Sequence, residues 1–162
     1  MSQSSQSTVE QRLAELGHTV PELAAPAGAY VPALRHGDLV HTSGQLPFVD
    51  GSLPTTGKVG EGEGLVDPEE AKRLAGLCAL NAIAAVKSVV GDLDRVTQVV
   101  KVVGFVASAP DFTGQPGVIN GASELLGEVF GSAGEHARSA VGVAALPLGA
   151  PVEVEVTVRV RS

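Results

Sequence analysis

The most regular pattern of apolar and polar positions lies near the end of the chain. From Val152 to Arg161, valine occupies every second position. Charged or hydroxyl side chains lie between: Glu153, Glu155, Thr157, Arg159 and Arg161. Successive side chains of a strand point to opposite faces, so a period of two places the five valines together. The pattern predicts a strand with one buried face and one polar face.

Apolar spacing elsewhere predicts two long helices. One begins at the N-cap Asp67 with Pro68 at its first position and ends at Gly91, and the other covers Pro116–Phe130. Further strands are predicted at 30–34, 39–43, 96–106 and 138–145, with one short strand possible within the loop 44–64, and a short helix follows Thr8. The order βββαβαββ predicts an α+β domain, one sheet with two long helices on one face. Residues 1–25 are interpreted as an extension before a domain at 26–162.

The strand from Arg138 to Ala145 carries an unusual face. Arg138 shares this face with Ala140, Gly142 and Ala144, which have almost no side chain, so a ligand or a second subunit would have room beside it. If residues 146–151 close a simple hairpin, Arg138 lies opposite Arg159. Glu153 would then be about 20 Å along the strand from Arg138, at roughly 3.4 Å per residue. A site that used both residues would need another strand arrangement or a second subunit. Because two helices cover only one face of a sheet, we expect a homo-oligomer.

Composition and charge exclude some functions. The chain has 162 residues, which fits one domain, with 3% aromatic residues and no Trp. Lys and Arg total 11 against 18 Asp and Glu, which gives a net charge of −7. An acidic chain with few aromatic side chains is poorly suited to nucleic acid, so we expect no nucleic-acid partner.

The cysteine content and the first residues of the chain indicate where in the cell the protein is expected. The single cysteine, Cys78, cannot form an internal disulfide and is interpreted as a small buried apolar residue. The polar start lacks the basic and apolar parts of a signal peptide, and the apolar runs are interrupted. We therefore expect a cytoplasmic protein without a membrane partner.

Candidate chemistry is sparse. No pair of the four histidines has the close helical spacing of a zinc enzyme, so no metal is expected. Ser43 lacks the G-x-S-x-G elbow of a serine nucleophile, which leaves a hydroxyl donor or a turn residue. Arg138 presents a planar fork suited to a carboxylate, although an ion pair with Glu153, Glu155 or a neighbouring subunit is an alternative.

Three segments together resemble the Rid/YjgF family of reactive-intermediate deaminases. They are Gly28–Val31 with LVHTSGQLP at 39–47, Asp111-Phe112 with Ile119-Asn120, and Ala137–Val141 running on to Val152–Glu155. The resemblance spans about residues 26 to 161. It implies a chorismate-mutase-like fold with a mixed sheet, and a homotrimer with sites between subunits. It also implies hydrolysis of an enamine or imine, such as that from 2-aminoacrylate, to a 2-keto acid and ammonia without a cofactor.

The resemblance also implies roles for individual residues. Arg138 would hold the substrate carboxylate, and Glu153 would position or activate water. Tyr30, Ser43 and Asn120 would line the pocket, with Tyr30 and Ser43 reaching the arginine of a neighbouring subunit. Ala140 stands where many members have Cys, so only its backbone could serve, and His136 replaces the usual Pro. The alternatives are a non-catalytic trimer that binds a small carboxylate and, third, an endoribonuclease, against which the acidic charge argues.

Overall fold

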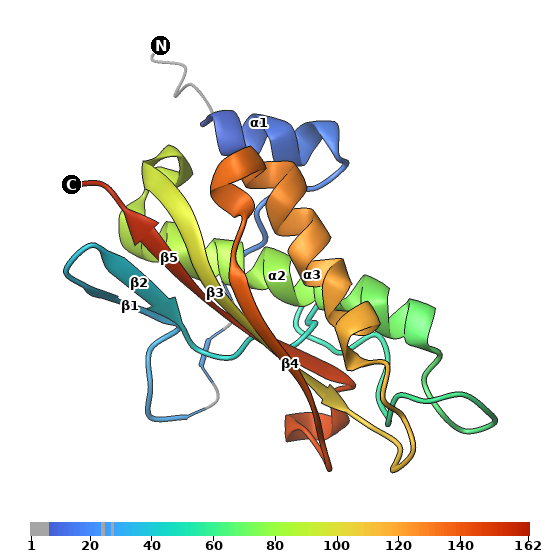
Figure 1. Ribbon diagram of the computed structural model, residues 1–162. Coiled ribbons are helices and arrows are strands. Elements are labelled where there is room, and N and C mark those ends of the chain that lie inside the picture. The colour runs from blue at the N-terminus through green and yellow to red at the C-terminus, as the bar shows by residue number, and fades with distance from the viewer. Residues whose placement is uncertain (1–6, 24, 27) are drawn as a thin grey trace.

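A computed structural model describes residues 7–23, 25–26 and 28–162, and shows one five-stranded sheet with α2 and α3 on one face (Figure 1). The order is α1 (Thr8–Glu15), β1 (Ala33–His36), β2 (Leu39–Thr42), α2 (Pro68–Val90), η1 (Leu93–Arg95), β3 (Val96–Ala107), α3 (Gln115–Phe130), η2 (Gly131–Gly134), β4 (Ala137–Val143), η3 (Pro147–Gly149) and β5 (Val152–Val160). The α+β class and the two covering helices are confirmed.

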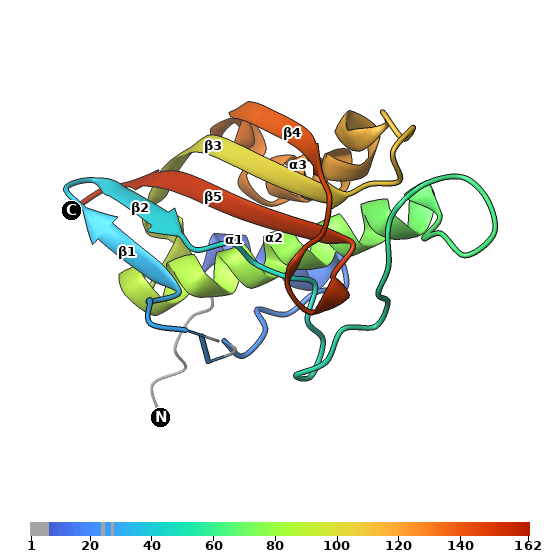
Figure 2. The same cartoon turned by 90° about the horizontal axis from the view of Figure 1, so that it is seen from below.

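The strand order is β1-β2-β5-β3-β4, so β3 separates the last two strands of the chain. Figure 2 shows β4 at one edge and β1 at the other. β3 pairs with β5 antiparallel and with β4 parallel, and α3 provides the crossover that a parallel pair requires. Of the two arrangements that the sequence left open for the last two strands, the simple hairpin is therefore excluded. Arg138 lies opposite Val102 of β3 rather than opposite Arg159.

The alternating valines of β5 form the centre of the core. All five are buried, with exposed fractions of 0 to 3%, and face the helices. The long helix α2 begins as expected at the N-cap Asp67, whose side chain accepts from the N–H of Glu69, and ends at Gly91. Within the described residues, α2 alone is long and apolar enough to cross a membrane, and 61% of its apolar window is buried inside the protein. In the sequence, the apolar runs had looked too interrupted for a membrane span. The burial of α2 identifies it as a core helix packed on the sheet and α3.

The segment 44–64 does not form a third strand before α2. It makes isolated bridges instead, of which the pair Gln45 and Val154 is tied by two backbone hydrogen bonds of 2.8 and 3.0 Å. These bonds attach the chain after β2 to β5, beside Glu153. The segment is thus fixed to the sheet without extending it.

The helix α1 is fastened to the rest of the protein through Asp94 in η1. The N–H groups of Thr8 and Val9 donate to its carboxylate at 2.8 and 3.0 Å. Burial alone would raise the pKa of Asp94, but these hydrogen bonds outweigh it and the pKa is lowered. Val9 and Leu13 are buried in the common core. The boundary at residue 26 stays a prediction.

Candidate functional site

Arg138 lies on the helix-covered face of the sheet, at its β4 edge. Its register partner Val102 and the next residue across, Val156, are both buried under the helices. The room for a ligand or a second subunit that the sequence suggested on this face is therefore limited by the helices. The residues beside Arg138 are small for another reason. Helix α3 packs so close to the sheet that a Cβ at Gly104, the partner of Ala140, would lie 2.5 Å from Ile119.

Two side chains of α3 hold the guanidinium of Arg138. Its Nη1 donates to Asn120 Oδ1 at 2.7 Å and to Ser123 Oγ at 3.3 Å. Asn120 and Ser123 are three residues apart on a helix, so both face β4. The structure thus brings Asn120 and Arg138 together as expected, and Ala140 follows on the same face of β4.

His136 extends this network by one step. Its Nδ1 lies 2.6 Å from the carbonyl oxygen of Gly134, which can only accept, so Nδ1 carries the proton. In the neutral imidazole, Nε2 then accepts a hydrogen bond from the Ser123 hydroxyl, whose Oγ is 2.8 Å away. The Ser123 oxygen is thereby left to accept from Arg138. Ser123 and His136 were not predicted as site residues. The position of Ser123 one turn after Asn120 was the available signal.

The remaining donors of Arg138 are free of protein partners within the described part of the chain. Both of its hydrogen bonds use Nη1, and none of the described carboxylates forms a salt bridge with it. The ion pair with Glu153 or Glu155 that the sequence left open is absent there. Because a guanidinium has five N–H donors, Nε and Nη2 can still bind both oxygens of a carboxylate.

Glu153 lies on the opposite, uncovered face of the sheet. Its register partner is Phe105, which also pairs with Val141 of β4, whereas Arg138 and Val102 belong to the other face. A Cβ at Gly44 would lie 2.1 Å from Glu153 Oε1, so the carboxylate rests against a backbone without a side chain. Burial, followed by repulsion from Glu155, raises the pKa of Glu153.

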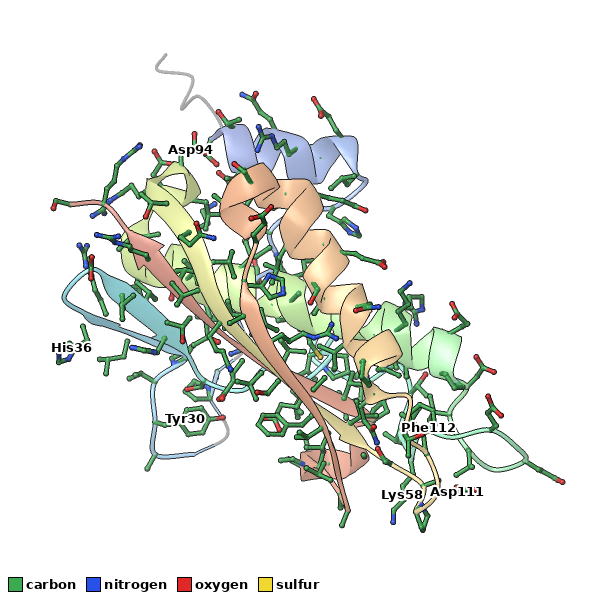
Figure 3. All side chains as sticks on the ribbon, viewed as in Figure 1. Tyr30, His36, Lys58, Asp94, Asp111 and Phe112 are labelled. Atoms are coloured by element: carbon green, nitrogen blue, oxygen red, sulfur yellow. The ribbon has the colours of Figure 1, made fainter. Side chains whose placement is uncertain are left out.

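Glu153 forms one wall of a cavity of about 340 Å³. Tyr30, which is half exposed on the segment before β1, forms another wall. Gly44, the residue after Ser43, also lines the cavity. In Figure 3, Tyr30 lies well away from Phe112, which is on the segment before α3. Ser43 itself donates its hydroxyl to the carbonyl of Val31 at 2.6 Å. The predicted residues thus form two groups: Arg138, Asn120 and Ala140 near α3, and Tyr30, Ser43 and Glu153 across the sheet.

A larger hollow of about 820 Å³ lies between residues 17–23 and α2. None of the predicted site residues lines it, although Gln45 and Phe48 belong to both cavities. No group of three or more His, Cys, Asp or Glu that could hold a metal ion gathers among the described residues. Cys78 is fully buried, and burial, with Glu153 as a smaller cause, raises the pKa of its thiol well above its usual value.

Residues 10–157 match the protein family described as "YjgF/chorismate_mutase-like, putative endoribonuclease". The chain belongs to the YjgF family. It is 44% identical over 155 residues to Protein TCP17 of Trypanosoma cruzi, with 95% of each chain covered. It is also similar to the crystal structure of Atu1372 from Agrobacterium tumefaciens, a protein of unknown function, at 46% identity and a TM-score of 0.87 over 95% of this chain and 93% of the other.

A third similar structure is that of Escherichia coli TdcF with bound serine. It is 26% identical, with a TM-score of 0.63 over 90% of this chain and 97% of that one. Membership of the YjgF family and its chorismate-mutase-like fold are therefore shown, as the sequence motifs predicted. The YjgF match covers both groups of site residues, from Tyr30 to Glu153.

Proposed function

We propose that the protein hydrolyses reactive enamines and imines of 2-aminoacrylate type to 2-keto acids and ammonia. The enamine first takes a proton at its terminal carbon and loses one from its nitrogen to give the imine. Water then adds to the C=N carbon, the C–N bond breaks, and one water is consumed for each 2-keto acid and ammonia released. Because an imine carbon is already electrophilic, positioning is the main task of the protein.

The observation that carries the proposal is the unpaired fork of Arg138. An arginine that no described carboxylate neutralises, and that Asn120 and Ser123 hold through one nitrogen only, is prepared for an anionic ligand. The bound serine of TdcF supports the same ligand class, because serine carries a carboxylate. Arg138 would fix the substrate carboxylate and thereby orient the C=N carbon.

Two subunits would complete the site. Within one chain Glu153 and Arg138 face opposite sides of the sheet, and β4, which carries Arg138, is an edge strand open to a neighbour. In a homotrimer with head-to-tail contacts, the cavity of Glu153 and Tyr30 can close over Arg138 of the next subunit. This arrangement agrees with the division of the predicted residues into two groups.

Glu153 would serve the attacking water. Its raised pKa makes the carboxylate a stronger base than an ordinary surface glutamate. Held against Gly44 in the wall of the cavity, it can accept a proton as water attacks the imine carbon. Ammonia leaves with that proton.

The test generates 2-iminopropionate from alanine with an amino-acid oxidase and follows its loss by competition with semicarbazide. Wild-type protein should speed ammonia release, and Arg138→Ala, with unchanged oligomer size and circular dichroism, should not. A folded wild-type protein without any acceleration would contradict the proposal. If 2-ketobutyrate then raised the melting temperature of wild type but not of Arg138→Ala, the protein would be a non-catalytic carboxylate-binding trimer instead.

The endoribonuclease in the family description is the weaker candidate for this chain. The net charge of −7 repels a phosphate backbone, and aromatic residues make up only 3% of the sequence. Salt-dependent RNA binding by a nuclease-free preparation would support it.

A further inference from the structure

Leu148, in the turn between β4 and β5, has an unusual backbone. Its φ of 60° and ψ of 15° lie in the left-handed region, which disfavours a bulky L side chain. Hydrogen bonds around it fix the turn: Gly149 N–H donates to Leu146 O and Ala150 N–H to Pro147 O, each at 3.1 Å. Gly57 N–H also donates to Gly149 O at 2.9 Å and ties the turn to the loop before α2. The conformation is therefore imposed by the surroundings of Leu148.

This backbone directs an apolar side chain into the cavity of Glu153. Leu148 is 68% exposed, and it lines the cavity together with its neighbour Pro147. Single exposed leucines are common on protein surfaces. A strained one at the wall of a candidate site is different, because strained conformations collect where side chains contact ligands.

The cavity is suited to the apolar part of a ligand. Its other apolar walls include Leu46, Phe48 and Pro32, and no Lys, Arg or His is found among its described lining residues. The substrate carboxylate therefore has no partner here, and its place is at Arg138 of the neighbouring subunit. What remains to occupy the cavity is the reacting carbon, beside Glu153, and the side chain attached to it.

The volume of the cavity exceeds what the smallest substrate needs. About 340 Å³ corresponds to roughly eleven water molecules at about 30 Å³ each. The side chain of 2-iminopropionate is a single methyl group, which would leave most of this apolar wall uncovered. A branched or longer apolar side chain would cover it.

We propose that Leu148 forms a subsite for an apolar substrate side chain, and that the protein prefers imines derived from larger apolar amino acids to 2-iminopropionate. This inference rests on the proposed function and specifies its substrate class. A well-fitted apolar group gives discrimination of about 10- to 200-fold per methylene at most. We expect kcat/KM for the imine from leucine to exceed that for the imine from alanine by about tenfold or more.

The test measures the ratio of these two kcat/KM values for wild type and for Leu148→Asn. Asparagine adopts left-handed backbone more readily than leucine, so the turn and the melting temperature should be kept. It is polar, so the ratio should fall about tenfold. Leu34→Asn, at a leucine that is 60% exposed on β1 and outside the cavity, is the matched control and should keep the wild-type ratio.

The outcomes separate the two proposals. Absence of turnover with either imine would refute the proposed function, and the subsite with it. Turnover of both imines with equal kcat/KM would overturn the subsite alone. The subsite is likewise overturned if Leu148→Asn leaves the ratio unchanged, whether activity is kept or falls equally for both imines.

Discussion

Arg138 and Glu153 lie on opposite faces of one sheet, with β3 between their strands. Arg138 shares the helix-covered face with Val102, and Glu153 shares the open face with Phe105. These are the two residues to which the family resemblance assigns the substrate carboxylate and the attacking water. If both act on one molecule, they come from different chains. The proposed function would therefore make a subunit contact part of the site.

Substitution of Arg138 by lysine tests whether the site needs the two-pronged geometry of the guanidinium or only its positive charge. Lysine keeps a cation but cannot bind two oxygens at fixed angles. A charge-assisted hydrogen bond contributes about 1.5–3 kcal/mol, so KM for the imine should rise about 10- to 150-fold. Steady-state kinetics of Arg138→Lys measure this. A KM within about twofold of wild type would show that charge alone suffices.

Gly44→Ala tests the position of the Glu153 carboxylate. The new methyl group would lie 2.1 Å from Oε1, and the flexible end of Glu153 can move away to relieve the overlap. We therefore expect a large loss of kcat with a melting temperature within a few degrees of wild type. Gly37→Ala, where a Cβ meets nothing but φ is +63°, is the control for backbone effects. Full activity in Gly44→Ala would remove Glu153 from the mechanism.

Replacement of His136 by phenylalanine tests how Arg138 is oriented. Phenylalanine keeps an aromatic ring at this position, but Ser123 loses the acceptor for its hydroxyl and is free to turn away from Arg138. Loss of one neutral hydrogen bond costs about 0.5–1.5 kcal/mol, so KM should rise about 2- to 12-fold with kcat nearly unchanged. His36→Phe, at an exposed residue of β1, should have wild-type KM. A fall in kcat alone would indicate another role for His136.

The raised pKa of Glu153 predicts how stability depends on pH. Burial, and then Glu155, raises this pKa above the value of 4.5 for a free glutamate, so the native protein binds this proton more readily than the unfolded chain. The stability that it contributes is full below about pH 4.5 and is lost as pH rises through the native pKa.

Denaturant unfolding of wild type and Glu153→Gln, from about pH 4 to pH 7, measures this effect. Glutamine cannot lose a proton, so the free energy of unfolding of wild type should fall relative to that of the variant as pH rises. The same change at Glu61, an exposed loop residue, is the control. A constant difference between wild type and Glu153→Gln would contradict the raised pKa.

Local patterns in the sequence predicted the elements well. The alternation of Val152 to Val160 predicted β5 and its buried face, and Asp67 and Gly91 marked the ends of α2. The pairing of the strands was not predicted from these patterns. The short connection 146–151 left a hairpin open, but β4 pairs with β3 through the α3 crossover, and the strand–helix–strand order was the signal for this pairing.

The candidate site was predicted only in part for the same reason. Arg138 and Asn120 meet because the crossover lays α3 over β4, which residue spacing alone does not reveal. The small residues beside Arg138 were interpreted as room for a ligand, whereas Gly104 and Ala140 make room for α3. Ser123 and His136 carry no motif, and only the hydrogen bonds identify them.

Mixing two inactive variants tests the shared site most directly. Arg138→Ala and Glu153→Gln subunits would be co-expressed with different tags, and the mixed oligomers purified and assayed for imine hydrolysis. In a head-to-tail trimer, a site is intact when one subunit supplies Arg138 and the next supplies Glu153, which holds for about one third of the sites in every mixed oligomer. We predict about a third of wild-type activity from the purified mixed oligomers and almost none from either variant alone. Mixed oligomers as inactive as the separate variants would contradict a site shared between subunits.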